Sequence, residues 1–300
     1  MSTGRYLCID VGGTAIKSGI IMASAPETVI SSRLTPTGQG GGPAIMGTVI
    51  ALTKSALDTD GLDGVCISTG GVIDTATGTV VAAADTIPHY AGTRIKETVM
   101  KECGVRCEVE NDVNCAALCE YQAQGRPSSL LCLTVGTGIG GAFIENGHVW
   151  HGWSQSACEV GYMHMPGGAF EKLASTSAMT ARYAAAAGLK PGQADGRSVI
   201  AAYQDGDPKA IAVLETMCDV LGMGISNICF VLNPQLVVLG GGIMARCDIL
   251  DPLITKALDR YMFPNLRANT KLTYARCGNQ AGMIGAYQHF VLMSSKQDHS

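Results

Sequence analysis

Two glycine-rich turns constrain the fold of this chain more than any other feature of its sequence. The first is Ile9-Asp10-Val11-Gly12-Gly13-Thr14, and the second is Thr134-Val135-Gly136-Thr137-Gly138-Ile139-Gly140-Gly141. In each, an apolar strand leads into small residues, and a second strand follows directly. Glycines in such a turn let backbone N–H groups approach an anion without obstruction by a Cβ atom. The repeated pattern predicts two related halves that bind one polyphosphate.

Length, charge and cysteine spacing exclude several classes of protein. The 300 residues suffice for two domains of ~150 residues each. A formal net charge of −4 argues against a nucleic-acid partner, which would need a basic face. The 12 cysteines form no C-x-x-C pair, so we expect reduced thiols. We find no signal peptide and no apolar run near ~18 residues, and therefore expect a cytoplasmic protein without a membrane partner.

The order of strands and helices predicts an α/β fold with mixed sheets, built twice over. Strands are expected over residues 5–9, 17–22, 29–34, 64–68, 107–110, 130–135, 142–145, 148–150, 236–239 and 271–275. Helices are expected over residues 43–57, 94–103, 113–124, 173–187, 210–231, 250–261 and 281–293. The Asn146-Gly147 pair between two apolar runs is a strong hairpin signal.

The residues of the first turn suit a phosphate site with a metal ion. The Asp10 carboxylate is expected to hold Mg²⁺ through water, and Lys17 lies close enough to add positive charge. Gly12, Gly13 and Thr14 are expected to contact phosphate oxygens. The alternative is a ligand-free Asx-type turn. The second glycine turn favours the phosphate interpretation.

Glu110-Asn111-Asp112 lies where a strand meets a helix. A helix N-terminus stabilises an ionised carboxylate there. An ionised Asp beside a hydroxyl group is the general base that kinases use to orient and deprotonate their acceptor. The alternative is that Asp112 is only the N-cap of the helix, which is a common structural role.

A third polar group surrounds Glu159. Its carboxylate suits hydrogen bonds to sugar hydroxyls, with the Asn111 amide as a partner, although an ordinary surface glutamate is an equal alternative. The nearby His151 and His164 are more often plain polar residues. Gly136, Gly138 and Gly141 also satisfy the dinucleotide pattern G-x-G-x-x-G. That pattern requires a following helix, whereas a hairpin is expected here, so we reject it.

Together these motifs resemble the ROK family of bacterial sugar kinases and repressors, over almost the whole chain. The resemblance implies two ribonuclease-H-like domains of the actin/hexokinase superfamily with a central cleft. It implies a sugar and phosphate domain over 1–116, completed by the helix at 281–293, and a nucleotide-binding domain over 117–280. The implied activity is ATP-dependent phosphorylation of a hexose at the 6-hydroxyl. The implied cofactors are ATP and Mg²⁺, and the usual assembly of the family is a homodimer.

The resemblance also implies roles for single residues. Asp112 becomes the catalytic base, and Asp10 the residue next to the metal. The implied sugar contacts are Asn111, Glu159, Ser68 and Gly71. The implied phosphate and nucleoside contacts are Asp10, Gly12, Gly13, Thr14, Lys17, Gly136, Thr137, Gly138, Gly241 and Gly242.

Two departures from the family pattern indicate which branch of the ROK family this chain resembles. Many relatives carry Glu-x-Gly-His and a cysteine-rich zinc cluster, but here Tyr162 replaces the histidine and no cysteine occurs between Cys158 and Cys218. We therefore expect no structural zinc. The chain resembles the zinc-free branch, with β-glucoside, N-acetylmannosamine and glucokinase-type members. Whether Tyr162 or His164 takes the place of the missing histidine, and which hexose is the acceptor, stay open.

Two other functional classes remain as alternatives. A sugar-responsive regulator would carry an additional DNA-binding segment, and we see no room for one before Tyr6. A non-catalytic sugar sensor of the same fold would not need Asp112. A DNA-binding assay at physiological salt tests for the regulator, and an assay of ADP release with and without hexose separates the sensor from a kinase.

Overall fold

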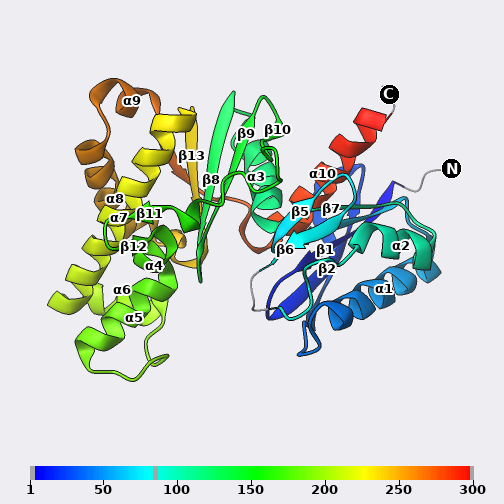
Figure 1. Cartoon of the computed structure of the whole chain (residues 1–300), viewed down its shortest axis with the longest axis horizontal. Coiled ribbons are helices and arrows are strands. Elements are labelled where there is room, and N and C mark those ends of the chain that lie inside the picture. Colours follow the sequence, from blue (N-terminus) through cyan, green and yellow to red (C-terminus); the bar gives the residue numbers. More distant parts are fainter. Residues whose placement is uncertain (1–3, 84–86, 298–300) are drawn as a thin grey trace. The chain divides into compact units, whose positions relative to one another are not determined.

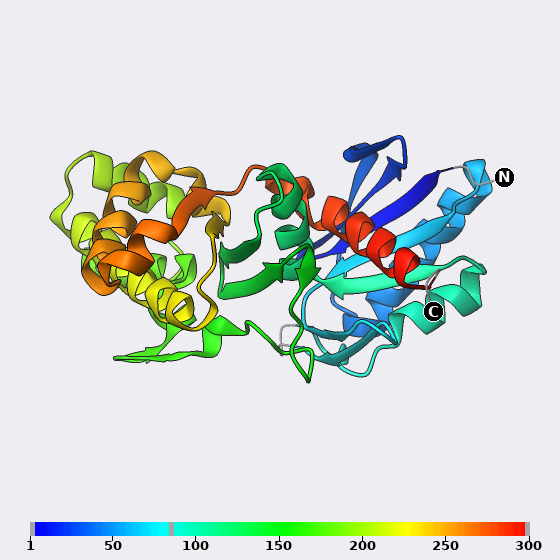
Figure 2. The same cartoon turned by 90° about the horizontal axis from the view of Figure 1, so that it is seen from above.

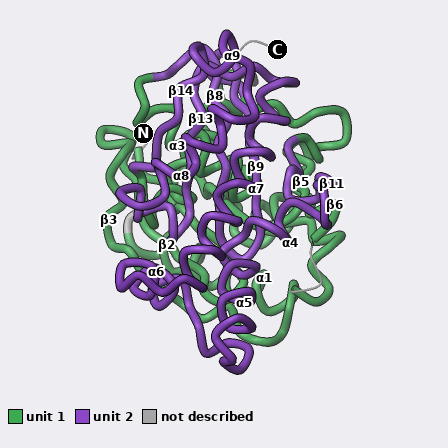
Figure 3. Tube along the Cα trace, turned by 90° about the vertical axis from the view of Figure 1, so that its left-hand side faces the viewer, with its two compact units in different colours: residues 1–125, 149–157, 277–300 green, residues 126–148, 158–276 purple. Residues whose placement is uncertain are grey.

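The computed structural model describes residues 4–83 and 87–297. The chain divides into two compact units (Figure 3). Unit 1 comprises residues 1–125, 149–157 and 277–300, and unit 2 comprises residues 126–148 and 158–276. The expected boundary between residues 116 and 117 falls inside α3 (Asp112–Ala123), and the whole of this helix belongs to unit 1.

Unit 1 is built on a five-stranded mixed sheet with the order β3-β2-β1-β4-β7. Its strands are β1 (Arg5–Val11), β2 (Ala15–Met22), β3 (Ala25–Pro36), β4 (Gly64–Thr69) and β7 (Cys107–Asn111). β1 pairs antiparallel with β2 through the first glycine turn, and parallel with β4. A separate hairpin joins β5 (Val72–Asp74) and β6 (Thr79–Ala82).

Helices cover both faces of this sheet, as alternation along β1 requires. Leu7, Ile9 and Val11 pack with α1 (Gly41–Asp60) and α2 (Ile95–Cys103). Cys8 faces the opposite side and packs with α3 and α10 (Ala281–Gln297). Figure 1 shows α1 and α2 beneath the sheet, and Figure 2 shows α10 running across its other face. The C-terminal helix is thus part of unit 1.

Unit 2 repeats the plan with a five-stranded sheet in the order β10-β9-β8-β13-β14. Its strands are β8 (Ser129–Val135), β9 (Ile139–Glu145), β10 (His148–Val149), β13 (Leu236–Gly240) and β14 (Lys271–Tyr274). β8 pairs antiparallel with β9 through the second glycine turn, and parallel with β13. β1 and β8 therefore occupy equivalent places, and the expectation of two related α/β halves is confirmed.

The helices of unit 2 pack into one core with Leu131, Leu133 and Val237 of the sheet. They are α4 (Phe170–Ala174), α5 (Thr176–Ala187), α6 (Gly196–Gln204), α7 (Pro208–Leu232), α8 (Cys247–Tyr261) and α9 (Pro264–Asn269). The short elements of the unit are η1 (Val160–Tyr162), β11 (His164–Met165), β12 (Gly168–Ala169) and η2 (Gly242–Ala245), while η3 (Gly278–Gln280) precedes α10 in unit 1.

α7 is long and apolar enough to cross a membrane by length and composition alone. This finding corrects the expectation that no apolar run approaches that length. The reason for its composition is packing, because α7 is in contact with α4, α5, α6 and α8, and 56% of its most apolar window is buried within the protein. It is therefore the central core helix of unit 2.

Candidate active site

Two hydrogen bonds fix the backbone of the first glycine turn. The Gly12 N–H donates to the Ala15 carbonyl at 3.1 Å, and the Thr37 hydroxyl donates to the Gly12 carbonyl at 2.7 Å. Gly13 and Thr14, at the tip of the turn, are exposed. The turn therefore presents Gly13 and Thr14 to solvent, where an anion is able to reach them.

Asp10, at the end of β1, is oriented by two neighbours. Lys17 Nζ lies 3.1 Å from Asp10 Oδ2, and the Ser68 hydroxyl donates to Asp10 Oδ1 at 2.8 Å. Gly282 of α10 packs directly on the carboxylate, since a Cβ at that position would lie 2.7 Å from Asp10 Cγ. Ser68 is completely buried. The Ser68 hydroxyl therefore orients Asp10, and its expected contact with a sugar stays a prediction.

Asn111, not Asp112, is the N-cap of α3. Its side-chain oxygen accepts from the backbone N–H groups of Val113 (2.8 Å) and Asn114 (3.0 Å). Its Nδ2 donates to the Gly71 carbonyl at 2.9 Å and to Asp112 Oδ1 at 3.1 Å. The amide therefore uses two acceptor and two donor positions within unit 1. A sugar contact through Asn111 requires exchange of the Nδ2–H bond to Asp112.

Asp112 is the first residue of α3 and does not serve as its N-cap. It is exposed, and a Cβ on Gly70 would lie 3.8 Å from Asp112 Oδ2, so the carboxylate adjoins the loop after β4. Desolvation by the crowded surroundings and the negative charge of Asp10 raise the pKa of Asp112, although hydrogen bonds from Val113 and Asn111 oppose the rise. Because the residue itself is exposed, crowding rather than complete enclosure causes the desolvation.

Glu110 anchors this region from beneath and is completely buried. Its Oε1 accepts from the Asn111 N–H at 2.8 Å and from Asn114 Nδ2 at 3.0 Å, and its Oε2 lies 2.7 Å from His151 Nε2. Burial opposes ionisation, but the hydrogen bond from His151, the charges of His289 and His151 and the Asn114 contact outweigh it and lower the pKa of Glu110. Sequence reasoning missed this cluster, because its members lie far apart in the chain.

In unit 2, the second glycine turn lies against the junction of α4 and α5. The Gly136 N–H donates to the Gly138 carbonyl at 2.9 Å, and the Thr176 N–H donates to the Gly136 carbonyl at 2.9 Å. Glu171 of α4 reaches the same turn, since its Oε2 would lie 2.5 Å from a Cβ on Gly138. Thr137, at the tip, is exposed. Neither Thr176 nor Glu171 was singled out from the sequence.

Glu159 and Gly161 adjoin this turn. A Cβ on Gly141 would lie 2.7 Å from the Cys158 carbonyl, and one on Gly161 would overlap the Ile139 carbonyl. Glu159 is exposed just before η1. Tyr162 and His164 are exposed as well, with 66% of the surface of Tyr162 accessible. Unit 2 thus brings Glu159 and the turn at residues 136–138 into one neighbourhood.

Gly242, which follows Gly241 in the chain, lines a pocket of about 600 Å³ within unit 2. The residues that line it come from α5, α6 and the segment after β13: Thr176, Asp195, Gly196, Arg197, Ile200, Ala201, Gln204, Gly242, Ile243, Ala245 and Arg246. Thr176 belongs to both this pocket and the second glycine turn. The pocket combines apolar side chains with arginines and polar groups, as a nucleoside site requires.

The backbone conformation at position 241 requires a glycine. Its φ is +107°, and a Cβ there would overlap the Val135 carbonyl. We expect Gly241→Ala to lose about 1–3 kcal/mol to strain, and therefore to lower Tm by several degrees. Differential scanning fluorimetry measures this shift. Gly242→Ala adds the same methyl group into open space and should keep the wild-type Tm. A wild-type Tm for Gly241→Ala would contradict the argument.

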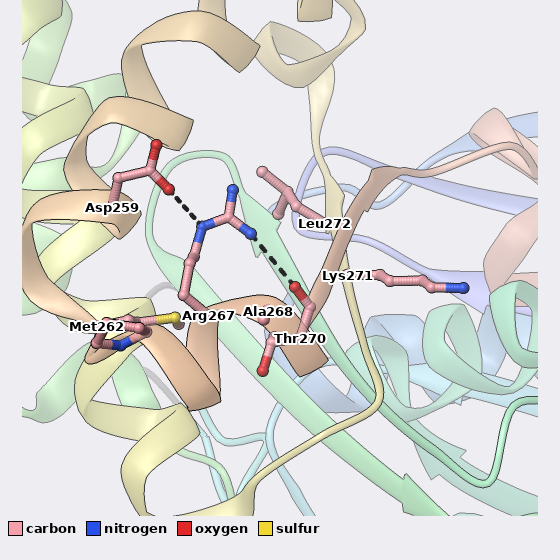
Figure 4. Close-up of a pocket in the computed structure, with 8 residues that line it drawn as sticks. Asp259, Met262, Arg267, Ala268, Thr270, Lys271 and Leu272 are labelled. Carbon is pink, nitrogen blue, oxygen red and sulfur yellow. Dashed lines mark hydrogen bonds and ion pairs between the residues drawn. The ribbon is translucent and has the colours of Figure 1, made fainter.

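A second hollow of unit 2, of about 570 Å³, lies beside α9 (Figure 4). Arg267 donates to Asp259 at 2.7 Å and to the Thr270 carbonyl at 3.5 Å. Figure 4 shows Arg267 held between these two partners. Its charge is already balanced, and none of the glycine turns lines this hollow. The pocket at Gly242 is therefore the better candidate for a nucleotide.

The residues present fit magnesium brought by a nucleotide. Within residues 4–83 and 87–297, no group of three or more His, Cys, Asp or Glu side chains is placed to hold a metal ion by itself. Mg²⁺ commonly keeps several waters and binds through one or two carboxylates and substrate phosphates. Asp10 supplies such a partly exposed carboxylate next to the first turn.

Known proteins resemble this chain over nearly its whole length. The model of the ROK family matches residues 6–291. An uncharacterized protein of Clostridium perfringens strain 13 is 41% identical, over 96% of this chain and 98% of that protein. A beta-glucoside kinase of Listeria monocytogenes is 28% identical, over 98% of this chain and 100% of that protein.

Among solved structures, a ROK hexokinase of Thermus thermophilus superposes with a TM-score of 0.83 at 27% identity, over 97% of this chain and 99% of that one. The expected α/β fold of the actin/hexokinase superfamily is therefore confirmed. Because the family match spans nearly the whole sequence, the chain belongs to the ROK family.

Proposed function

We propose that this protein is an ATP-dependent sugar kinase that phosphorylates the 6-hydroxyl of a hexose or hexose derivative. The observation that carries the proposal is Asp112, an exposed carboxylate of raised pKa at the start of α3, beside Asp10 and the first glycine turn. The names of relatives support it: they include a beta-glucoside kinase, a glucokinase and an N-acetyl-D-glucosamine kinase, each 28% identical.

Asp112 acts as the general base in this proposal. Its carboxylate accepts the proton of the sugar hydroxyl, and the oxygen attacks the γ-phosphorus of ATP in line, with ADP as the leaving group. Asn111 and Gly71 position the sugar through the loop that Asn111 Nδ2 holds. Glu159 accepts hydrogen bonds from further hydroxyls, and Tyr162 or His164 takes the place of the histidine that many relatives carry.

The two glycine turns supply the charge stabilisation. Gly12, Gly13, Thr14 and Lys17 of unit 1 bind phosphate oxygens, as do Gly136, Thr137 and Gly138 of unit 2. Mg²⁺, held through water by Asp10, would neutralise charge on the phosphates. The nucleoside occupies the pocket at Gly241 and Gly242, so unit 2 is the nucleotide-binding domain. Unit 1 is the sugar and phosphate domain.

A coupled assay of ADP release tests the proposal. We expect release with ATP and Mg²⁺ to depend on one or more sugars from a panel of glucose, N-acetylglucosamine, N-acetylmannosamine and β-glucosides. Mass spectrometry of the product should show one added phosphate at the 6-position. Sugar binding by calorimetry without any phosphorylated product would instead identify a sugar sensor. Neither binding nor turnover with any hexose would contradict the proposal.

The pH profile should report the raised pKa of Asp112. The base acts only when ionised, and its surroundings and Asp10 favour the protonated form. The acid limb of kcat/KM should therefore lie at a higher pH than the ordinary Asp pKa of 3.8. Asp10→Asn removes the neighbouring negative charge, so the limb of its residual activity should move to lower pH. An acid limb at or below 3.8 in the wild type would exclude Asp112 as the base.

We further propose that the protein is cytoplasmic and forms a homodimer. Reduced thiols are typical of a cytoplasmic protein, and all 12 cysteines are free in the structure. Sedimentation equilibrium of the purified protein tests for the homodimer. A mass near that of one 31.1 kDa chain at micromolar concentration would contradict it.

A further inference from the structure

The buried carboxylate of Glu110 links two parts of unit 1 that are separate in sequence. Its Oε1 accepts from the Asn111 N–H and from Asn114 Nδ2, at the start of α3. Its Oε2 lies 2.7 Å from His151 Nε2, in the segment 149–157. One carboxylate thus connects the turn that carries Asp112 to a segment about forty residues further along the chain.

The segment 149–157 reaches unit 1 as a short excursion of the chain. The preceding residues 126–148 and the following residues 158–276 both belong to unit 2. Within the segment, the Ala157 N–H donates to the His151 carbonyl at 3.1 Å. Its side-chain contacts with the rest of unit 1 include the His151–Glu110 bond and a hydrogen bond of 3.5 Å between Thr75 and Gln155. The first is the shorter, and its acceptor is completely buried.

The lowered pKa of Glu110 favours its ionised form, and this form sets the direction of the His151 bond. An ionised carboxylate only accepts hydrogen bonds, so His151 Nε2 carries the proton and donates it. His289 of α10 approaches the same Oε2 through Nδ1 at 3.3 Å. Charge-assisted bonds of this kind are stronger than neutral ones and hold a precise geometry. Of the two histidine contacts to Glu110 Oε2, loss of His151 would leave the longer one, to His289.

We propose that His151 is a positioning residue of the active site: through Glu110 it fixes the Asn111–Asp112 turn and docks the segment 149–157 on unit 1. This inference rests on the proposed kinase function, because the turn that it fixes carries the general base. His151 does not touch the reacting atoms in this role. Its effect reaches them through the two oxygens of one carboxylate.

Steady-state kinetics provide the first test. Displacement of a catalytic group by about 1 Å costs up to about 10²-fold in rate. We therefore expect His151→Ala to lower kcat by about tenfold or more with a much smaller change in KM for ATP, because the nucleoside pocket lies in unit 2. His151→Gln, whose amide is able to donate to Glu110, should recover most of the lost kcat. His148→Ala, which removes an exposed histidine three positions away, is the matched control and should behave as wild type.

Tryptophan fluorescence provides a second test that needs no activity. The chain has two tryptophans, Trp150 and Trp153, and both lie in the segment beside His151. Their anisotropy therefore reports the mobility of this segment alone. We expect His151→Ala to lower the anisotropy, with His151→Gln and His148→Ala close to wild type. Far-UV circular dichroism and Tm identify any variant that has unfolded, and Glu110→Gln then serves as the alternative means of weakening the bond.

The two measurements separate the two hypotheses. If no hexose is phosphorylated but the anisotropy falls as expected, the kinase proposal fails while the docking role of His151 stands. If the wild type is an active kinase and a folded His151→Ala retains its kcat, the positioning role is overturned. An unchanged anisotropy in folded His151→Ala overturns the docking role. Equal losses in His151→Ala and His151→Gln, without rescue, also overturn the proposal.

Discussion

Replacing Asp112 by asparagine is expected to lower kcat by about 10²–10⁴-fold, the usual contribution of a general base. The amide cannot accept the proton of the sugar hydroxyl at neutral pH. Its oxygen still accepts the hydrogen bonds that Asp112 Oδ1 receives from Val113 and Asn111, so the start of α3 should be preserved. The ADP-release assay measures kcat, and calorimetry should show that ATP still binds, since the nucleoside pocket lies in unit 2.

Stability distinguishes lost chemistry from lost structure in this variant. The pKa of Asp112 is raised in the folded protein, so its ionisation opposes folding, and this opposition grows as pH rises above the pKa of the unfolded chain. Asparagine lacks this unfavourable ionisation, and the variant should be at least as stable as the wild type at neutral pH. Asp58→Asn, an exposed change in α1, is the matched control. A kcat within a factor of about ten of wild type would exclude Asp112 as the base.

The sequence predicted the main elements because their signals are local. Gly12 and Gly136 follow apolar strands and precede others, and both turns join antiparallel pairs as expected. The Asn146-Gly147 turn lies between β9 and β10. An amphipathic pattern located α1, and helical composition located α3, α7, α8 and α10, all to within a few residues. The central strands of both sheets were found for the same reason.

Short elements and contacts between residues far apart in the chain could not be predicted from such local signals. The expected helix over 173–187 is interrupted at Ser175, whose side chain caps α5 after α4 has ended. α6, α9 and the hairpin of β11 and β12 were missed, because a few residues give little periodicity. The burial of Ser68 and the capping role of Asn111 depend on neighbours far along the chain. The same is true of the contact between His151 and Glu110.

Gly285→Ala is expected to destabilise the protein strongly, although it adds only one methyl group. α10 crosses α3 at this position, and a Cβ on Gly285 would overlap the backbone carbonyl of Cys115. A clash with backbone is not relieved by a rotamer change, so the two helices must separate. Overpacking of this kind typically costs about 1–3 kcal/mol. Because α10 also packs on β1, β4 and β7, the loss should affect unit 1 as a whole.

Gly47→Ala provides the opposite case with the same chemical change. Gly47 is an exposed glycine inside α1, and a Cβ there would meet nothing within 4 Å. Alanine in a helix interior is favoured over glycine by about 0.5–1 kcal/mol, so this variant should be more stable than the wild type. Thermal and denaturant unfolding of both variants measure the difference. The close approach of α10 to α3 then explains why residue 285 must be glycine, whereas helix propensity alone predicts stabilisation at both positions. Equal stabilisation of the two variants would contradict the packing of α10 described above.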